Sequence, residues 1–231
     1  MNKKILITGT SKGIGKYLVD YYTKLGNTVI GCSRSKINNT FENYEHFVCD
    51  ISDEKSVKRL FKKISKDHGR IDILINNAGI SSMNHSLLTD ISTVKNIFNT
   101  NLIGSFLLMR EAAKLMQKNK FGRIINFSTV AVPLAIEGEA IYASSKAAVI
   151  SLTKTLSKEL SNFGITVNAI GPTPVKTDLI KSIPQKKIDD LINKQTIKRY
   201  GEFQDISNVI DFFISEKSDF ITGQEIYLGG V

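Results

Sequence analysis

The sequence is short of several residue types, and each shortage excludes a class of protein. It has no tryptophan, two cysteines and four prolines among its 231 residues. Two cysteines are too few for a disulfide-stapled scaffold and are typical of reduced thiols in the cytoplasm. The apolar stretch before Gly9 is too short for a secretory signal, and no run approaches the roughly 18 apolar residues of a membrane-spanning helix. We therefore expect a cytoplasmic protein that does not cross a membrane.

The chain carries an excess of positive charge, with 31 lysines and arginines against 22 aspartates and glutamates. The basic residues are spread out, and one group recurs at helical spacing: Lys55, Lys58, Arg59, Lys62, Lys63 and Lys66. This spacing predicts a solvated helix face, because aromatic side chains do not alternate with the charges as on a surface that binds single-stranded nucleic acid. We expect no nucleic-acid partner, although a net charge of +9 is compatible with a phosphorylated or carrier-linked substrate.

Short apolar segments alternate with segments of helical periodicity along the whole chain. Strands are expected at 4–8, 28–32, 46–49, 71–75, 123–127, 165–170 and 225–228, and helices at 13–25, 53–68, 92–99, 102–118, 141–162 and 205–215. This alternation predicts the α/β class: a single doubly wound Rossmann-type domain over residues 1–231, with a parallel sheet of about seven strands and helices on both faces. Residues 172–200 give weaker signals, and we expect them to form a substrate lid.

A glycine-rich turn, Thr8-Gly9-Thr10-Ser11-Lys12-Gly13-Ile14-Gly15, lies between the first strand and the first helix. Glycine permits positive φ and close approach of the backbone to a ligand. The N-terminus of a helix also offers unpaired N–H groups and a positive dipole end to a pyrophosphate. In this position the turn predicts a dinucleotide site, whereas elsewhere it would be an ordinary tight turn.

The end of the second strand indicates which nicotinamide cofactor is bound. In dinucleotide-binding folds an acid there binds the ribose 2′-hydroxyl, and an arginine accommodates a 2′-phosphate. Residues 28–35 contain no acid but include Ser33 and Arg34, and Lys12 lies in the glycine turn nearby. Because these cations would pair with a phosphate that a carboxylate would repel, we predict a preference for NADP(H).

Two further groups follow predicted strands at the same edge of the sheet. Asp50 could accept a hydrogen bond from the adenine amino group, or could instead begin the next helix. The run Asn76-Asn77-Ala78-Gly79 could belong to the site or simply form a turn, since asparagine and glycine both favour turns.

Tyr142 and Lys146 lie four residues apart, so a helix places both side chains on one face. Of the seven tyrosines, only Tyr142 has a lysine four residues later. Reduction of a carbonyl needs a proton donor beside the oxygen, and a nearby ammonium would lower the pKa of a tyrosine from its usual value near 10. Alone, the two would be a surface pair; together with a dinucleotide turn, they predict the catalytic pair of an oxidoreductase.

In these motifs and their spacing the sequence resembles the short-chain dehydrogenase/reductase family over essentially its whole length. The glycine turn is similar to that family's cofactor loop, and residues 76–79 to its sheet-stabilising motif. Tyr142 and Lys146 match its catalytic pair, and Asp50 matches its adenine-contacting acid. Asn101 matches the asparagine that kinks a helix and holds a water in the proton relay. Ile221-Thr222-Gly223-Gln224 with Gly229-Gly230 is similar to its C-terminal signature.

The resemblance implies a catalytic set and a homotetramer or homodimer. The implied catalytic residues are Asn101, Thr129, Tyr142 and Lys146, and Lys146 would also hydrogen-bond the nicotinamide ribose. The implied cofactor-binding residues are Gly9, Ser11, Lys12, Gly13, Ile14, Gly15, Ser33, Arg34, Asp50, Ile51, Asn77, Ala78, Gly79, Tyr142, Lys146, Pro172, Thr173, Val175 and Thr177.

Three positions depart from the family pattern. Thr129 stands where a serine is usual; its hydroxyl also donates, but its methyl group stiffens the side chain, and Ser128 is the alternative. Pro172-Thr173 replaces a Pro-Gly pair, which predicts a stiffer loop. Residues 199–203 read Arg-Tyr-Gly-Glu-Phe where Arg-x-Gly-x-Pro is usual, a change that mainly concerns the lid.

The predicted function is NADP(H)-dependent transfer of a hydride between nicotinamide and a carbonyl or secondary alcohol. The implied substrate is a small-molecule or carrier-linked ketone of 3-oxoacyl, sugar or polyketide type. Lys120 could contact an acidic carrier protein, although Phe163 stands where such reductases often carry a second cation. The alternative is a non-catalytic NADP(H)-binding regulatory protein, which the residues at 129 and 173 leave open. His46, His68 and His85 are scattered without ligand spacing, so no metal site is predicted.

Overall fold

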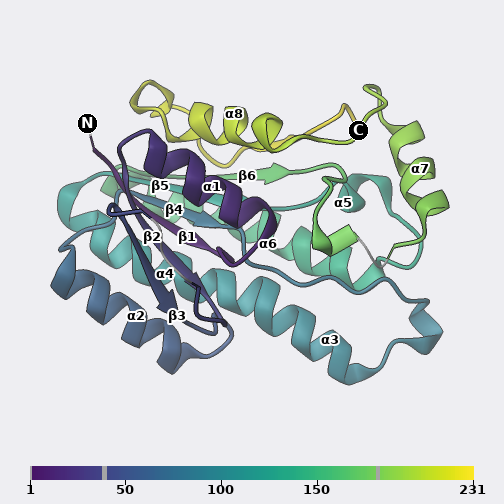
Figure 1. Cartoon of the computed structure of the whole chain (residues 1–231), viewed down its shortest axis with the longest axis horizontal. Helices are drawn as coiled ribbons and strands as arrows, with labels where there is room; N and C mark the ends of the chain where they lie inside the picture. The colour runs from purple at the N-terminus through teal and green to yellow at the C-terminus, as the bar shows by residue number, and fades with distance from the viewer. Residues whose placement is uncertain (1, 38–40, 181–182) are drawn as a thin grey trace.

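The computed structural model describes residues 2–37, 41–180 and 183–231. Within these ranges seven strands form one sheet in the order β3-β2-β1-β4-β5-β6-β7, and all neighbouring strands are parallel (Figure 1). Their bounds are Lys4–Thr8, Thr28–Ser33, Tyr44–Val48, Ile73–Asn76, Gly122–Phe127, Ile165–Gly171 and Glu225–Tyr227 for β1 to β7. The direction of strand order reverses between β1 and β4, the point at which doubly wound sheets bind ligands. The predicted fold class is confirmed.

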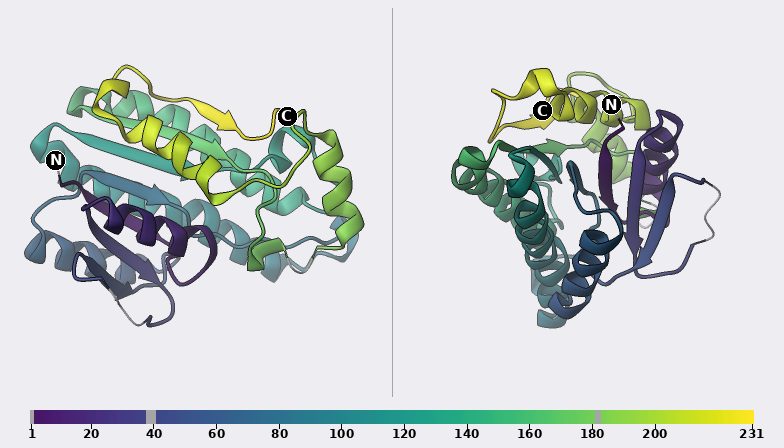
Figure 2. Two further views of the ribbon diagram at one scale, coloured as in Figure 1. Left: turned by 45° about the horizontal axis from the view of Figure 1, so that its top comes forward. Right: turned by 90° about the vertical axis from the view of Figure 1, so that its left-hand side faces the viewer.

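Helices cover both faces of this sheet. They are α1 (Gly13–Lys24), α2 (Glu54–Asp67), α3 (Ile91–Phe98), α4 (Ser105–Met116), α5 (Ala131–Leu134), α6 (Ala140–Leu160), α7 (Gln185–Lys194) and α8 (Phe203–Ile214). Figures 1 and 2 show α1 and α8 over one face, with α2, α4 and α6 over the other.

Alternating side chains of the strands supply the two layers of the core. In β1, Ile5 and Ile7 pack with Leu18 of α1 and Ile210 of α8. Leu6, between them, points to the opposite face and packs with residues of α2 and α4. This is the two-residue period of a strand buried on both sides, which explains why an inner strand such as β1 reads as a continuous apolar run.

The structure differs from the expected elements mainly outside the sheet. Every strand lies within two residues of its expected bounds. The helices expected at 92–99 and 102–118 are joined by a π-helical turn, η2 (Asn99–Gly104), and α5 and α7 were not expected. Asp53 caps α2, because its carboxylate accepts hydrogen bonds from the N–H groups of Lys55 and Ser56.

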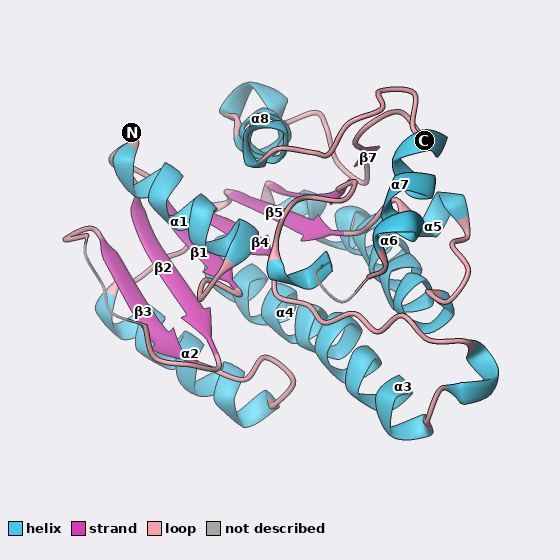
Figure 3. Ribbon diagram, turned by 45° about the vertical axis from the view of Figure 1, so that its right-hand side comes forward, coloured by secondary structure: helices cyan, strands magenta, loops and turns pink. Residues whose placement is uncertain are grey.

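The carboxyl ends of the central strands point toward the side of the molecule that carries α5 and α7 (Figure 3). Residues 181–182, within the stretch expected to form a lid, lie outside the described part of the chain. In that described part no helix is long and apolar enough to cross a membrane.

Candidate active site

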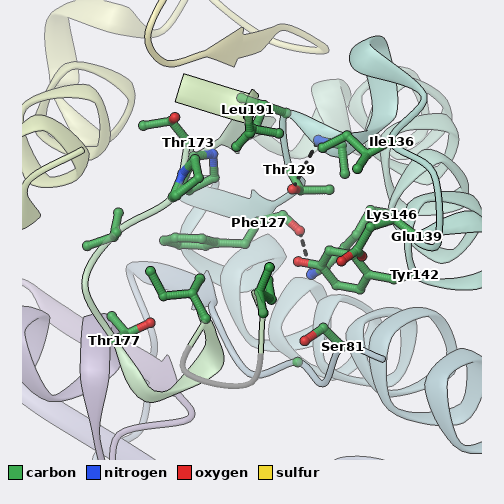
Figure 4. Close-up of a pocket in the computed structure, with 18 of the residues that line it drawn as sticks. Ser81, Phe127, Thr129, Ile136, Glu139, Tyr142, Lys146, Thr173, Thr177 and Leu191 are labelled. Carbon is green, nitrogen blue, oxygen red and sulfur yellow. Dashed lines mark hydrogen bonds between the residues drawn. The ribbon is translucent and has the colours of Figure 1, made fainter. Parts of the chain in front are cut away.

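A pocket opens beyond the carboxyl ends of β4, β5 and β6. It brings together residues from several predicted motifs: Ile14, Asn77, Gly79, Ser128, Thr129, Tyr142, Lys146, Pro172, Thr173, Val175 and Thr177. Figure 4 shows Glu139, Tyr142 and Lys146 on one wall, with Thr173 and Thr177 on the opposite wall. Residues separated by more than a hundred positions along the chain therefore meet in one cavity.

The glycine turn is built for close backbone approach. Gly9 and Gly13 have φ of +74° and +57°, and a Cβ on Gly15 would lie 2.2 Å from the carbonyl oxygen of Gly9. Lys12 occupies the N-cap position of α1 without a capping hydrogen bond from its side chain, and the first turn of the helix holds no acidic residue. The N–H groups at this helix end therefore face no competing carboxylate on their own helix, as an anion site requires.

The run from Asn76 to Gly79 fastens this turn to the centre of the sheet. The side-chain amide of Asn77 donates to the carbonyl oxygen of Thr8 at 2.8 Å, and the N–H of Ala78 donates to the Thr8 hydroxyl at 2.9 Å. Asn76 donates to the side chain of Asn126 in β5 at 2.9 Å. These contacts go beyond an ordinary turn, because they join β4 to both β1 and β5.

The residues expected to hold a 2′-phosphate lie at the end of β2. Ser33 is buried and Arg34 is exposed. The Nζ atom of Lys12 lies 3.3 Å from a carboxylate oxygen of Asp178, beyond β6, so Lys12 does not pair here with the Ser33–Arg34 end. His46 does lie there, with its Nε2 atom 3.3 Å from the Ser33 hydroxyl and 3.0 Å from the carbonyl oxygen of Ser35.

Asp50 and Ile51 follow β3. One carboxylate oxygen of Asp50 accepts hydrogen bonds from the N–H and the hydroxyl of Ser52, at 2.9 and 2.7 Å. Ile51 is buried, and a Cβ on Gly104 would lie 2.9 Å from its Cγ1 atom. Asp50 therefore orders the turn before α2 and leaves the capping of that helix to Asp53.

Asn101 lies in the π-helical turn and is completely buried. Its side chain accepts from the N–H of Ile80 and donates to the carbonyl oxygen of Ile80, both at 2.9 Å. The same amide donates to the hydroxyl of Ser145 at 3.0 Å, which donates to the carbonyl oxygen of Tyr142 at 2.7 Å. A π turn is common at functional sites, and here it links the segment after β4 to the turn that carries Tyr142.

Lys146 is 4% exposed, and its ammonium donates to the carbonyl oxygen of Phe127 at 2.8 Å (Figure 4). Burial lowers the pKa of Lys146 to about 8. Gly79 leaves room for the ammonium, since a Cβ there would lie 3.4 Å from Nζ and 3.2 Å from Oδ1 of Asn101. A buried ammonium oriented by a carbonyl is a strong local positive charge in the pocket.

The pKa of Tyr142 is raised well above its usual value near 10. Burial is the main cause, the carboxylate of Glu139 adds to it, and the hydroxyl of Thr129 opposes it. The expected lowering by Lys146 is therefore wrong for this structure, because the cost of burying a phenolate outweighs any attraction to the ammonium. At neutral pH Tyr142 holds its proton.

The two candidate hydroxyl groups after β5 have different neighbours. Thr129 accepts a hydrogen bond from the N–H of Ala131 at 3.2 Å, and its hydroxyl lies close enough to Tyr142 to lower the pKa of that tyrosine. Ser128 is buried, and its hydroxyl acts in the same way on Tyr227. This difference favours Thr129 over Ser128 as the partner of Tyr142.

The segment after β6 closes the pocket on the side opposite Tyr142. Pro172 accepts a hydrogen bond from the N–H of Val130 at 3.3 Å. Thr173 is buried, and its hydroxyl has no hydrogen-bond partner among the described residues. Val175 bridges to Gly201, and Thr177 lies beside Gly13. The loop is thus tied to α5, to the glycine turn and to the segment before α8.

Three residues of this region are missing from the prediction. Ser145 carries the link from Asn101 to Tyr142, His46 lies behind Ser33, and Glu139 is a buried acid in the pocket. A signal existed for Glu139, which stands three residues before Tyr142 and so on the same side of a helix. His46 and Tyr44 lie two residues apart and so on the same side of β3, and the Tyr44 hydroxyl lies 3.0 Å from the Nδ1 atom of His46. In the described ranges no group of three or more His, Cys, Asp or Glu side chains could hold a metal ion.

Comparison with known proteins identifies the family. Residues 9–230 match the family model described as Enoyl-(Acyl carrier protein) reductase. A protein of Rickettsia felis, 3-oxoacyl-[acyl-carrier-protein] reductase FabG, is 35% identical over 234 residues, covering 99% of this chain and 95% of the relative. The chain belongs to the short-chain dehydrogenase/reductase family, and the resemblance seen in its sequence is confirmed.

Solved structures show the same likeness over the whole chain. ElxO with NADP bound is 33% identical with a TM-score of 0.90, covering 99% of this chain and 97% of that one. 4-hydroxyisoleucine dehydrogenase complexed with NADH is 31% identical with a TM-score of 0.89, covering 99% and 98%. Both neighbours are described with a nicotinamide cofactor.

Proposed function

We propose that this protein is an NADP(H)-dependent oxidoreductase that reduces a ketone to a secondary alcohol. The observation that carries the proposal is the meeting of Thr129, Tyr142 and Lys146 in one pocket at the strand ends, next to the glycine turn. Relatives named as reductases and a solved neighbour named as a dehydrogenase support it. They do not favour the alternative of a non-catalytic NADP(H)-binding regulatory protein.

The residues present fit a bound NADP(H). The first turn of α1 holds no acid, and the Gly9–Gly15 contact leaves no space for a side chain. The buried hydroxyl of Thr173 has no hydrogen-bond partner in the part of the chain that the structure describes. We assign the pyrophosphate to residues 9–15, the 2′-phosphate to Ser33 and Arg34, the adenine to Asp50 and Ile51, and the nicotinamide side to Asn77, Ala78, Gly79, Lys146, Pro172, Thr173, Val175 and Thr177. When bound, NADPH supplies the hydride that reduces the carbonyl carbon.

The side chains supply the proton and hold the carbonyl oxygen. The hydroxyl groups of Thr129 and Tyr142 donate hydrogen bonds to this oxygen and so polarise the carbonyl bond. As the oxygen gains charge, it becomes a stronger base than the phenolate and takes the proton of Tyr142, which the raised pKa keeps protonated at neutral pH. The ammonium of Lys146 then stabilises the phenolate, and Asn101 holds the turn through which a water would return the proton.

Two classes of ketone are candidate substrates. A 3-oxoacyl group on an acidic carrier protein would suit the names of the relatives and the net charge of +9. Lys120 is exposed for such a partner, but Phe163 is exposed as well and offers no second cation. A free hydroxylated, sugar-like ketone is the second class.

We further propose that residues 1–231 act as one domain, with a lid at about 172–200. In the described part of that stretch, Ile188 and Leu191 of α7 are buried and line the pocket. Exposed apolar side chains support a homotetramer or homodimer, since they could form contacts between copies of the chain. They lie in two segments, with Ile103 and Phe106 in the first and Phe212 and Phe220 in the second. The two cysteines are free thiols, which supports a cytoplasmic location.

The test is oxidation of NADPH by the purified protein over a panel of acyl thioesters, sugars and simple ketones. We expect turnover with at least one ketone and a higher kcat/KM for NADPH than for NADH. Cofactor binding without oxidation anywhere in the panel would leave the non-catalytic alternative standing. A higher kcat/KM for NADH would overturn the assignment of Arg34 to a phosphate.

A further inference from the structure

Glu139 is a buried carboxyl group in the pocket that neither gives nor takes a proton in the proposed reaction; its one effect there is to help keep Tyr142 protonated. Its side chain is 5% exposed, and its Oε2 atom has no hydrogen-bond partner among the described residues. It lines the pocket with Tyr142 and Lys146, and Figure 4 shows the three on the same wall. Burying a carboxyl oxygen without a hydrogen-bond partner among the described residues costs folding free energy, so stability of the fold does not account for it.

The backbone holds Glu139 in place at the start of α6. Its N–H donates to the carbonyl oxygen of Ile136 at 3.1 Å, and its own carbonyl oxygen accepts from the N–H of Ala143 at 2.7 Å. The side chain does not cap the helix, although the residue occupies the N-cap position. The carboxyl group therefore lies about one helical turn before Tyr142, on the side that faces the pocket.

The charged groups around this carboxyl come from two elements. Lys146 belongs to α6, and Lys187 reaches the pocket from α7, with its Nζ atom 3.7 Å from the place that a Cβ on Gly138 would occupy. Burial raises the pKa of Glu139 to about 7, and the attraction of Lys187 only partly opposes this. Tyr142 is the other titratable group on this wall, and its pKa is also raised. In either protonation state Glu139 retains an oxygen that accepts a hydrogen bond.

We propose that Glu139 selects the substrate by accepting a hydrogen bond from a hydroxyl group that the ketone carries next to its carbonyl carbon. The inference rests on the ketone reduction proposed above and names its substrate class. A plain acyl chain would leave the Oε2 atom of Glu139 buried without a hydrogen-bond partner, which a site rejects more strongly than it rejects a missing apolar contact. An ammonium group would approach two lysines as well as one carboxylate, so a hydroxyl group suits the pocket better.

Three small ketones separate these chemistries. Hydroxyacetone carries the hydroxyl group, butanone has a methyl group in its place, and aminoacetone has an ammonium group. The proteins are the full-length wild type, Glu139→Leu and Glu139→Gln, with Glu137→Leu as a matched control because Glu137 is exposed on the same loop. The readouts are kcat/KM with NADPH and, independently of turnover, binding of each compound to protein saturated with NADP⁺, followed by ligand-observed NMR.

We expect the wild type to prefer hydroxyacetone over both other compounds by at least about tenfold in kcat/KM. Glu139→Leu should lose this preference, and Glu137→Leu should keep it. The preference should grow as pH rises through about 7 in the wild type, because the carboxylate is the stronger acceptor. In Glu139→Gln the preference should not change with pH. This variant tests the role of Glu139 even if Glu139→Leu does not fold.

The outcomes also separate this inference from the reductase proposal. If no ketone is reduced but hydroxyacetone binds better than butanone only while Glu139 is present, the assignment of Glu139 stands and the reductase proposal fails. If ketones are reduced but hydroxyacetone and butanone perform equally, the assignment of Glu139 is wrong. The same holds if aminoacetone is preferred, or if Glu139→Leu retains the wild-type preference.

Discussion

At the scale of single residues, the pocket keeps protons where the proposed reaction needs them. Burial raises the pKa values of both Tyr142 and Glu139, while it lowers that of Lys146 to about 8. Near neutral pH the tyrosine is therefore a donor and the lysine is still mostly an ammonium. A reductase needs both forms together, whereas oxidation of an alcohol would need the phenolate.

The raised pKa of Glu139 predicts a pH-dependent stability. The ordinary pKa of a glutamate is 4.5, and burial raises that of Glu139 to about 7 in the folded protein. Between these two pH values the folded state binds more protons than the unfolded state, so the stability of the protein falls as pH rises. Each pH unit of this window is worth about 1.4 kcal/mol. The unfolding free energy of Glu139→Gln relative to wild type should therefore rise by about 1 to 3 kcal/mol between about pH 4.5 and pH 7, and should level off above that.

Urea unfolding at several pH values measures this difference. Glu137→Gln is the control, because its exposed carboxyl group should give no such trend. Parallel stability curves for the wild type and Glu139→Gln would show that Glu139 is not held in a desolvated site.

At the scale of elements, the π-helical turn η2 fixes the segment after β4 against α6. Asn101 satisfies both backbone groups of Ile80 and also reaches Ser145. No other described contact to the N–H of Ile80 competes with this one, so the geometry of the turn and the position of Ile80 depend on one side chain.

Asn101→Ala should destabilise the protein by about 1 to 3 kcal/mol, because it leaves the partly buried N–H and carbonyl groups of Ile80 without this partner. It should also lower turnover, since the link to the backbone of Tyr142 is lost. Urea unfolding and steady-state kinetics measure the two effects. Asn99→Ala is the matched control, because Asn99 lies in the same turn but is exposed. Equal stability of the two variants would contradict the role given to the Asn101 side chain.

The strands were predictable from the sequence, and the helices α5 and α7 were not. The five inner strands, β1, β2, β4, β5 and β6, are buried on both faces, so the apolar run that signals each of them is also the cause of its position. The helix α5 has only four residues, too few for a helical period, and α7 lies in a lysine-rich stretch with prolines nearby, where its apolar residues Ile188 and Leu191 give a weak signal. The sequence pattern predicts a gap between two helices at 99–102, whereas the structure has a continuous π-helical turn there. The hydrogen bonds of Asn101 in this turn are made with Ile80 and Ser145, which are distant in the sequence, so the local pattern does not reveal them.

At the scale of the whole molecule, the parallel sheet gathers the site from distant parts of the chain. The glycine turn follows β1, Asn77 follows β4, Thr129 follows β5 and Thr173 follows β6, and all line or border one pocket. Because parallel strands end at one edge, the sequence indicates which residues meet. It does not indicate burial or charge, and so Glu139 and the direction of the pKa change at Tyr142 follow only from packing.

The central claim is that Tyr142 supplies the proton for ketone reduction, and Tyr142→Phe tests it most directly. The measurement is NADPH oxidation with the best ketone of the panel, together with the Kd of NADPH for each protein. We predict that turnover falls by a factor of about 10² to 10⁴ while NADPH still binds. Tyr21→Phe is the control and should keep wild-type turnover, because the hydroxyl of Tyr21 donates a hydrogen bond to Asp211, away from the pocket. Near-wild-type turnover of Tyr142→Phe would contradict the account.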